Sequence, residues 1–108
     1  MKTKNIPKKD RIPPVHPGQI LLAEFLVPEG ISQYRLAQAT GLPASRISDL
    51  VKSRRGITPD SAIRLGKALG VSADFWLNLQ KHYDLRLAQD ANESEYAAIP
   101  LLSGQIAA

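Results

Sequence analysis

The chain has 108 residues, of which 44% are hydrophobic and 22% are charged, and its formal net charge is +4. This length fits one domain and excludes a multidomain enzyme or a large barrel. The absence of cysteine excludes disulfides, thiolate zinc sites and cysteine nucleophiles, and it fits a cytoplasmic location. No apolar run approaches the roughly 20 residues of a membrane span. The excess of basic over acidic residues favours an anionic partner.

The charges are distributed unevenly along the sequence. Residues 1–11 carry a net charge of +4, residues 46–55 carry +3, and residues 84–108 carry −3. A charge run is usually a solvated face, which is the preferred interpretation of the first segment. Prolines lie among its lysines, so residues 1–15 are expected to form a flexible basic arm. Weak periodicity over residues 92–108 predicts a tail of uncertain order.

Between the arm and the tail, residues 16–91 are predicted to form an all-helical domain of five helices. Pro17 suits the first turn of a helix, and apolar residues recur at helical spacing until Pro28 and Gly30 stop it. Ser32 is expected to cap the second helix. Gly41 is expected to end that helix in the left-handed conformation.

The remaining three helices are marked by similar signals. Pro43 is expected to open the third helix and Gly56 to break it. Thr58 and Ser72 are the predicted N-caps of the fourth and fifth helices. The buried stripe of the fourth helix is predicted to consist of Ala62, Leu65, Ala68 and Leu69. No segment alternates strictly enough to form a strand.

The stretch from Gln33 to Lys52 has the residue pattern of a helix-turn-helix. Counted from Gln33, a small residue stands fifth and a glycine ninth, where two short helices cross closely and the chain turns sharply. Apolar residues at the fifteenth and eighteenth positions would hold the third helix against the second. These four positions are Ala37, Gly41, Ile47 and Leu50. The less favoured alternative is a plain helical bundle with a tight corner.

The third helix is therefore predicted to be a recognition helix in the major groove of DNA. Ala44 can touch a thymine methyl group, and Asp49 can accept from a cytosine amino group or pair internally with Arg46 or Lys52. The predicted base-contacting residues are Ala44, Ser45, Arg46, Ser48 and Asp49. Cationic side chains after the helix and the N-terminus of the second helix are placed for phosphates. The predicted phosphate-contacting residues are Gln33, Lys52, Arg54 and Arg55.

Several segments together resemble the HigA antitoxins of the Cro/cI-like (XRE) helix-turn-helix superfamily. They include His16–Leu26 (HPGQILLAEFL), Gly30–Gln33 (GISQ) and Phe75–Gln80 (FWLNLQ), the last being the most specific to this family. The resemblance covers about residues 16–89 and implies a compact five-helix Cro/cI-like domain. It also implies that the chain neutralises a HigB-like toxin, an mRNA-cleaving ribonuclease, and represses its own operon as a dimer on operator DNA.

The fifth helix offers more apolar surface than one core face can absorb, so it is the predicted homodimer interface. The interface residues are expected to be Trp76, Leu79, Tyr83 and Leu87. No paired histidines, phosphate loop or nucleophile motif is present, so we expect no metal, no cofactor and no enzymatic activity. Two alternatives stay open: a stand-alone XRE-family regulator without a toxin, and an interaction module that no longer binds DNA.

Overall fold

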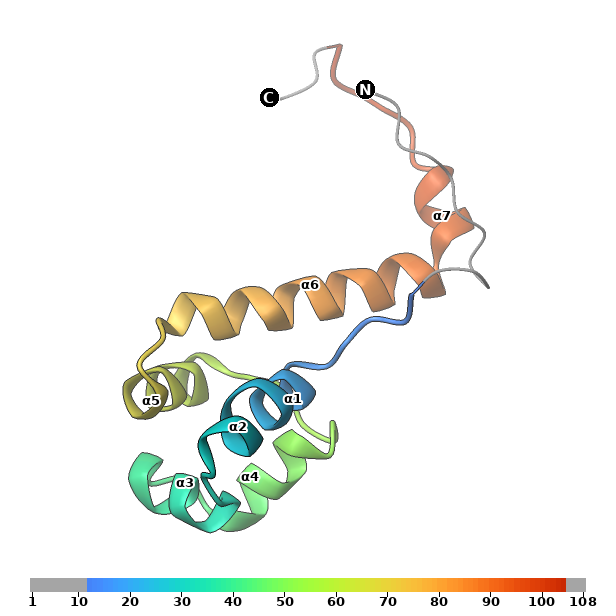
Figure 1. The fold of residues 1–108 in the computed structure, drawn as a ribbon. Coiled ribbons are helices and arrows are strands. Elements are labelled where there is room, and N and C mark those ends of the chain that lie inside the picture. The colour runs from blue at the N-terminus through green and yellow to red at the C-terminus, as the bar shows by residue number, and fades with distance from the viewer. Residues whose placement is uncertain (1–11, 105–108) are drawn as a thin grey trace.

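The computed structural model describes residues 12–104, and all the secondary structure in that range is helical (Figure 1). The first helix consists of three consecutive segments, α1 (Pro17–Ile20), η2 (Leu21–Leu26) and α2 (Val27–Glu29). The others are α3 (Gln33–Thr40), α4 (Ala44–Val51), α5 (Pro59–Leu69), α6 (Ala73–Ala91) and α7 (Glu93–Ala97). The all-α class is confirmed.

The predicted arm and the predicted tail lie at the two ends of the chain. Most of the predicted basic arm, residues 1–11, lies outside the described range, and residues 12–16 form neither helix nor strand. The short helix α7 occupies the start of the tail, for which no defined structure was predicted.

The first helix continues through Pro28, which was expected to stop it. A proline inside a regular α-helix collides with the carbonyl of the preceding turn. Here that turn is widened, because Leu21–Leu26 are π-helical and the Val27 N–H bonds to the Leu22 carbonyl. A π-bulge is one of the known ways in which a helix accommodates such a disturbance. The helix then ends at Gly30, whose φ is 66°.

The predicted hydroxyl caps are confirmed. The side chains of Ser32, Thr58 and Ser72 each accept a hydrogen bond from the backbone N–H three residues ahead, at 3.0, 3.2 and 3.1 Å. Gly41 closes α3 with a φ of 76°, as the left-handed turn required. These local signals therefore fix where α3, α5 and α6 begin.

The core is centred on Trp76, whose side chain is completely buried within the single chain. Its ring centroid lies 5.1 Å from those of Phe25 and Phe75. Trp76 therefore has no surface to offer a second subunit, and its assignment to a dimer interface is corrected.

The buried face of α5 also differs from the prediction. Ala68 is exposed, and Gly66 is buried instead, because α5 turns Gly66 toward the start of α6.

The molecule is elongated, with extents of 51 × 30 × 24 Å, and α6 is its longest helix. Its N-terminal half packs on α5, while its C-terminal half extends past the other helices and leads to α7 (Figure 1). The segment preceding α1 runs back toward this half, where the Arg86 Nη2 donates to the Ile12 carbonyl at 2.6 Å. Exposed apolar side chains lie on the C-terminal half of α6, on α7 and on the residues that follow α7. They are Leu85, Leu87, Tyr96, Ile99, Leu101 and Leu102.

Candidate nucleic-acid interface

The helices α3 and α4 lie on the side of the domain away from α6 (Figure 1). The side chains at the diagnostic positions of the helix-turn-helix behave as their spacing predicts. Ala37, Ile47 and Leu50 are buried, and Gly41 supplies the left-handed turn. The surfaces of α3 and α4 that face away from this contact are therefore free to meet a partner.

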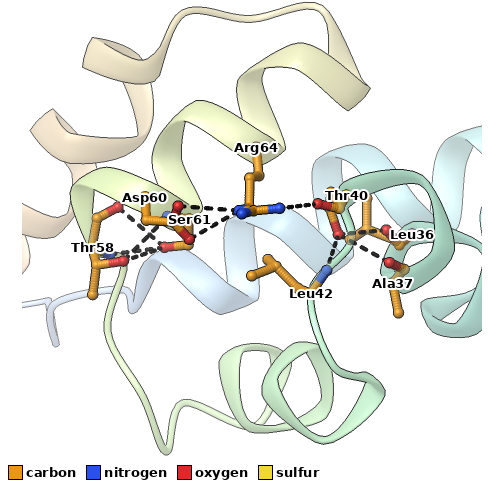
Figure 2. Close-up of polar contacts among 8 residues, drawn as sticks. All are labelled: Leu36, Ala37, Thr40, Leu42, Thr58, Asp60, Ser61 and Arg64. Carbon is orange, nitrogen blue, oxygen red and sulfur yellow. Dashed lines mark hydrogen bonds and ion pairs between the residues drawn. The ribbon is translucent and has the colours of Figure 1, made fainter.

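A polar network fixes the turn between α3 and α4 (Figure 2). The Thr40 hydroxyl donates to the Leu36 carbonyl at 2.8 Å and accepts from the Leu42 N–H at 3.3 Å. From α5, Arg64 Nη1 donates to the Thr40 carbonyl at 2.8 Å, and its Nε pairs with Asp60. The cation thus satisfies a carbonyl that the end of α3 leaves without a helical partner. Local spacing in the sequence does not reveal this role of Arg64, because Thr40 lies 24 residues away.

The structure places the predicted base-contacting residues along one side of α4. Ala44 and Ser45 are exposed at its N-terminus, whereas Ser48 and Asp49 are half-buried one turn later. Arg46 is also half-buried, at the edge of this face. Within residues 12–104, no ion pair joins Asp49 to Arg46 or Lys52, so the internal pairing considered for Asp49 is absent. Gln33 is exposed at the first position of α3.

The helix α4 ends earlier than Gly56, at Val51, in a Schellman motif. The Arg54 N–H donates to the Asp49 carbonyl at 2.8 Å, and the Ser53 N–H donates to the Leu50 carbonyl at 3.1 Å. Ser53 adopts a φ of 60°, a conformation that usually selects glycine. This sharp reversal places a short loop directly after the recognition helix.

The loop that follows α4, residues 52–57, carries the three predicted phosphate-contacting cations Lys52, Arg54 and Arg55. All three side chains are exposed. None of them forms an ion pair with another residue between positions 12 and 104. Their charge is thus available to an external anion, and we refer to this segment as the basic loop.

His16 is the N-cap residue of α1 and lies close to the Arg55 backbone in the basic loop. The side chain is buried, its Nδ1 accepts from the Gly18 N–H at 2.8 Å, and its ring meets Tyr83 edge-on at 4.9 Å. Burial lowers the pKa of His16, and this effect outweighs the nearby Asp84 carboxylate and the Arg55 backbone carbonyl, which favour protonation. The N-cap requires the neutral ring, because a protonated Nδ1 cannot accept.

Folding stability is therefore expected to fall as the pH is lowered through the ordinary histidine pKa near 6.5, because the unfolded chain binds a proton more readily than His16 does in the fold. The variant His16→Asn keeps a good cap but cannot titrate in this range. Urea unfolding at about pH 7.5 and about pH 5.5 should show a larger loss for the wild type than for the variant. An equal loss in both proteins would exclude His16 as its source.

None of the helices within residues 12–104 is long and apolar enough to cross a membrane. The same residues contain no group of three histidine or acidic side chains that could hold a metal ion. The candidate interface consists of the exposed face of α4, the N-terminus of α3 and the basic loop.

Comparison with known proteins identifies the family. The family model described as Helix-turn-helix matches residues 22–76. The chain is 44% identical over 93 residues to Virulence-associated protein I of Dichelobacter nodosus, covering 86% of each chain. It is 40% identical over 78 residues to Antitoxin HigA-1 of Vibrio cholerae, covering 72% of this chain and 73% of that one.

A solved structure of Pseudomonas aeruginosa antitoxin HigA with the higBA promoter is similar with a TM-score of 0.78 and 44% sequence identity. The match covers 83% of this chain and 99% of that one. This family consists of DNA-binding proteins and not of enzymes, which agrees with the prediction from the sequence. The chain belongs to the HigA-type antitoxins of the helix-turn-helix family.

Proposed function

We propose that this protein binds operator DNA in the promoter of its own operon, in the cytoplasm, and represses transcription. The observation that carries the proposal is the basic loop, whose three exposed cations have no ion-pair partner within residues 12–104 and directly follow a recognition helix with an exposed first turn. Such cations neutralise phosphates, and exposed side chains at the start of α4 can reach base edges. The similar Pseudomonas aeruginosa antitoxin is described with its promoter, which supports the same role here.

The test separates phosphate contacts from base readout. Arg54→Ala should weaken binding to operator and to random DNA alike, and the slope of log K against log salt should fall by about 0.9, since one phosphate is no longer neutralised. Ser45→Ala should cost about 1–3 kcal/mol on the operator and little on random DNA. Both effects are measured by salt titration of the two DNAs.

Either half of this prediction can fail separately. An unchanged salt slope for Arg54→Ala would remove Arg54 from the phosphate-contacting set. Equal weakening of Ser45→Ala on operator and random DNA would remove Ser45 from base readout. Failure of the wild type to prefer its promoter over random DNA would contradict the proposed function itself.

The family also leads us to propose a toxin partner, an mRNA-cleaving ribonuclease of the HigB type. The protein should relieve the growth arrest caused by expressing such a toxin from the neighbouring gene and should co-purify with it. If the neighbouring gene encodes no such toxin and no co-purifying protein is found, the chain is a stand-alone regulator. DNA binding by the basic loop is expected in both cases, since it does not require the toxin.

We further propose that the repressor is a homodimer held by the projecting half of α6. One recognition helix covers only a few base pairs, so a two-fold dimer is needed to read an operator. The four residues predicted for this interface have different environments. Trp76 is buried, Leu79 and Tyr83 are half-buried, and Leu87 is 43% exposed. The neighbouring Leu85 is 52% exposed, so the apolar surface lies nearer the end of the helix than expected.

Leu87→Glu is expected to shift the protein from dimer to monomer and to weaken operator binding, because a charge would be buried in the interface. Ile63→Glu is the matched control, since Ile63 is a similarly exposed apolar residue on α5. Analytical ultracentrifugation of both variants measures the effect. A wild-type protein that sediments as a monomer at high micromolar concentration would contradict the proposed dimer.

A further inference from the structure

From the contacts between α6 and the basic loop, we infer that Gln80 is a positioning residue for DNA binding: its side chain holds the loop that presents Arg54 and Arg55. This inference rests on the proposed DNA-binding function. Gln80 belongs to α6, far along the chain from the loop. Nothing in the proposed phosphate contacts requires Gln80 itself to touch DNA.

The contact is a direct hydrogen bond to the end of the loop. The Ile57 N–H donates to Gln80 Oε1 at 2.7 Å, and the Gln80 Nε2 donates in turn to Asp84 Oδ1 at 2.9 Å. Ile57 is buried, and its N–H belongs to no helix. A backbone N–H in such a place must find a partner, and the fixed amide of Gln80 supplies it.

The amide also packs against the loop one residue earlier. A Cβ built on Gly56 would lie 3.0 Å from the Gln80 Nε2 and 3.1 Å from its Cδ and Oε1. A side chain at position 56 would crowd the Gln80 amide, which would have to move by a few tenths of an ångström. Gln80 therefore touches two successive backbone units directly after Arg55.

The other end of the loop is fixed independently by the Schellman motif at Ser53 and Arg54. The two cations Arg54 and Arg55 lie between these two anchors. Without the Gln80 anchor, the loop would rotate so that the Ile57 N–H could reach water. The bound protein would then hold Arg54 and Arg55 less firmly against their phosphates, so that phosphate contacts and the affinity that they supply would be lost.

The experiment compares three variants at pH 7.5 by salt titration on operator and random DNA. Gln80→Leu removes both hydrogen bonds while keeping a side chain of similar size. The double variant Gln80→Glu/Asp84→Asn exchanges donor and acceptor, so residue 80 can still accept from the Ile57 N–H and can also accept from residue 84. Asn78→Leu is the matched control, because it replaces an exposed amide on the same helix.

We expect Gln80→Leu to bind both DNAs about tenfold more weakly, as one unpaired buried N–H implies. Its salt slope should fall by about 0.9 for each phosphate that the loop no longer reaches, and the double variant should recover both affinity and slope. Asn78→Leu should match the wild type. Hydrogen exchange on the free wild-type protein should show a protected Ile57 amide.

A Gln80→Leu protein with wild-type affinity and slope would overturn the inference, even though the wild type still bound DNA. A freely exchanging Ile57 amide would overturn it as well, and this readout does not depend on whether Gln80→Leu folds. Failure of the double variant to recover the slope would show that residue 80 supports the fold and does not position the loop. If the wild type bound neither DNA, the proposed function itself would fail, and this inference with it.

Discussion

Trp76→Ala is expected to lower the free energy of unfolding by about 3–5 kcal/mol, the cost of removing a fully buried aromatic ring. The Trp76 side chain has no exposed surface and lies against the rings of Phe25 and Phe75. Its loss would leave a cavity where the first helix meets α6. For a domain of this size, the Tm should fall by more than about 10 °C. Urea unfolding followed by circular dichroism measures the change.

Trp76→Phe is the control for this prediction. The indole Nε1 is buried and has no hydrogen-bond partner among residues 12–104, so phenylalanine removes an unsatisfied donor together with part of the ring. The expected loss is smaller, about 1–2 kcal/mol. The core assignment would be contradicted if Trp76→Ala left the free energy of unfolding unchanged and instead caused the dimer to dissociate. That outcome would return Trp76 to the interface in which the sequence analysis placed it.

The sequence predicted those parts of the fold that depend on neighbouring residues. The N-caps at Ser32, Thr58 and Ser72 satisfy N–H groups only three residues away. Gly41 needs only its own backbone freedom to make the turn of the helix-turn-helix. Hydroxyl caps and glycine turns act locally, so their positions can be predicted from spacing alone.

Predictions were wrong where the backbone adopted a geometry that the general rules for proline and glycine do not anticipate. Pro28 was expected to stop the first helix, but a π-helical turn accommodates it. Gly56 was expected to break α4, but the chain already reverses at Ser53, a residue that rarely adopts this conformation. At Gly56 the glycine instead serves the close approach of Gln80, which local spacing does not reveal.

The residues of the candidate site also divide into those that local sequence predicts and those that depend on distant contacts. Exposed cations after α4 could be predicted from charge and position, and Ala44 and Ser45 from the helical face. The groups that hold these elements in place come from elsewhere in the chain. Arg64 reaches Thr40 across 24 residues, and Gln80 reaches Ile57 across 23. A single sequence gives no information on such pairs, because Arg64 and Gln80 each look like an ordinary polar residue on the surface of a helix.

Gly18→Ala is expected to have the largest effect on the recognition helix. A Cβ on Gly18 would overlap the Leu50 carbonyl oxygen and lie 2.6 Å from the carbonyl carbon. Both are backbone atoms of α4, so no side chain can move aside, and either α1 or α4 must shift. The cost should be about 3 kcal/mol, at the upper end for overpacking. The shift should also weaken operator binding at temperatures where the variant remains folded, because α4 carries the predicted base contacts.

Gly70→Ala is the matched control for this effect. Gly70 has a φ of 75° with open space around it, so alanine there is strained by its backbone conformation and meets no neighbour. The expected cost is about 1–2 kcal/mol. Operator affinity should stay at the wild-type value, since Gly70 lies in the turn between α5 and α6. Unfolding and operator titration of both variants therefore distinguish two effects. Gly70→Ala reports backbone strain alone, and Gly18→Ala also reports displacement of the recognition helix. Equal operator affinity of the two folded variants would show that the contact between α1 and α4 does not govern DNA binding.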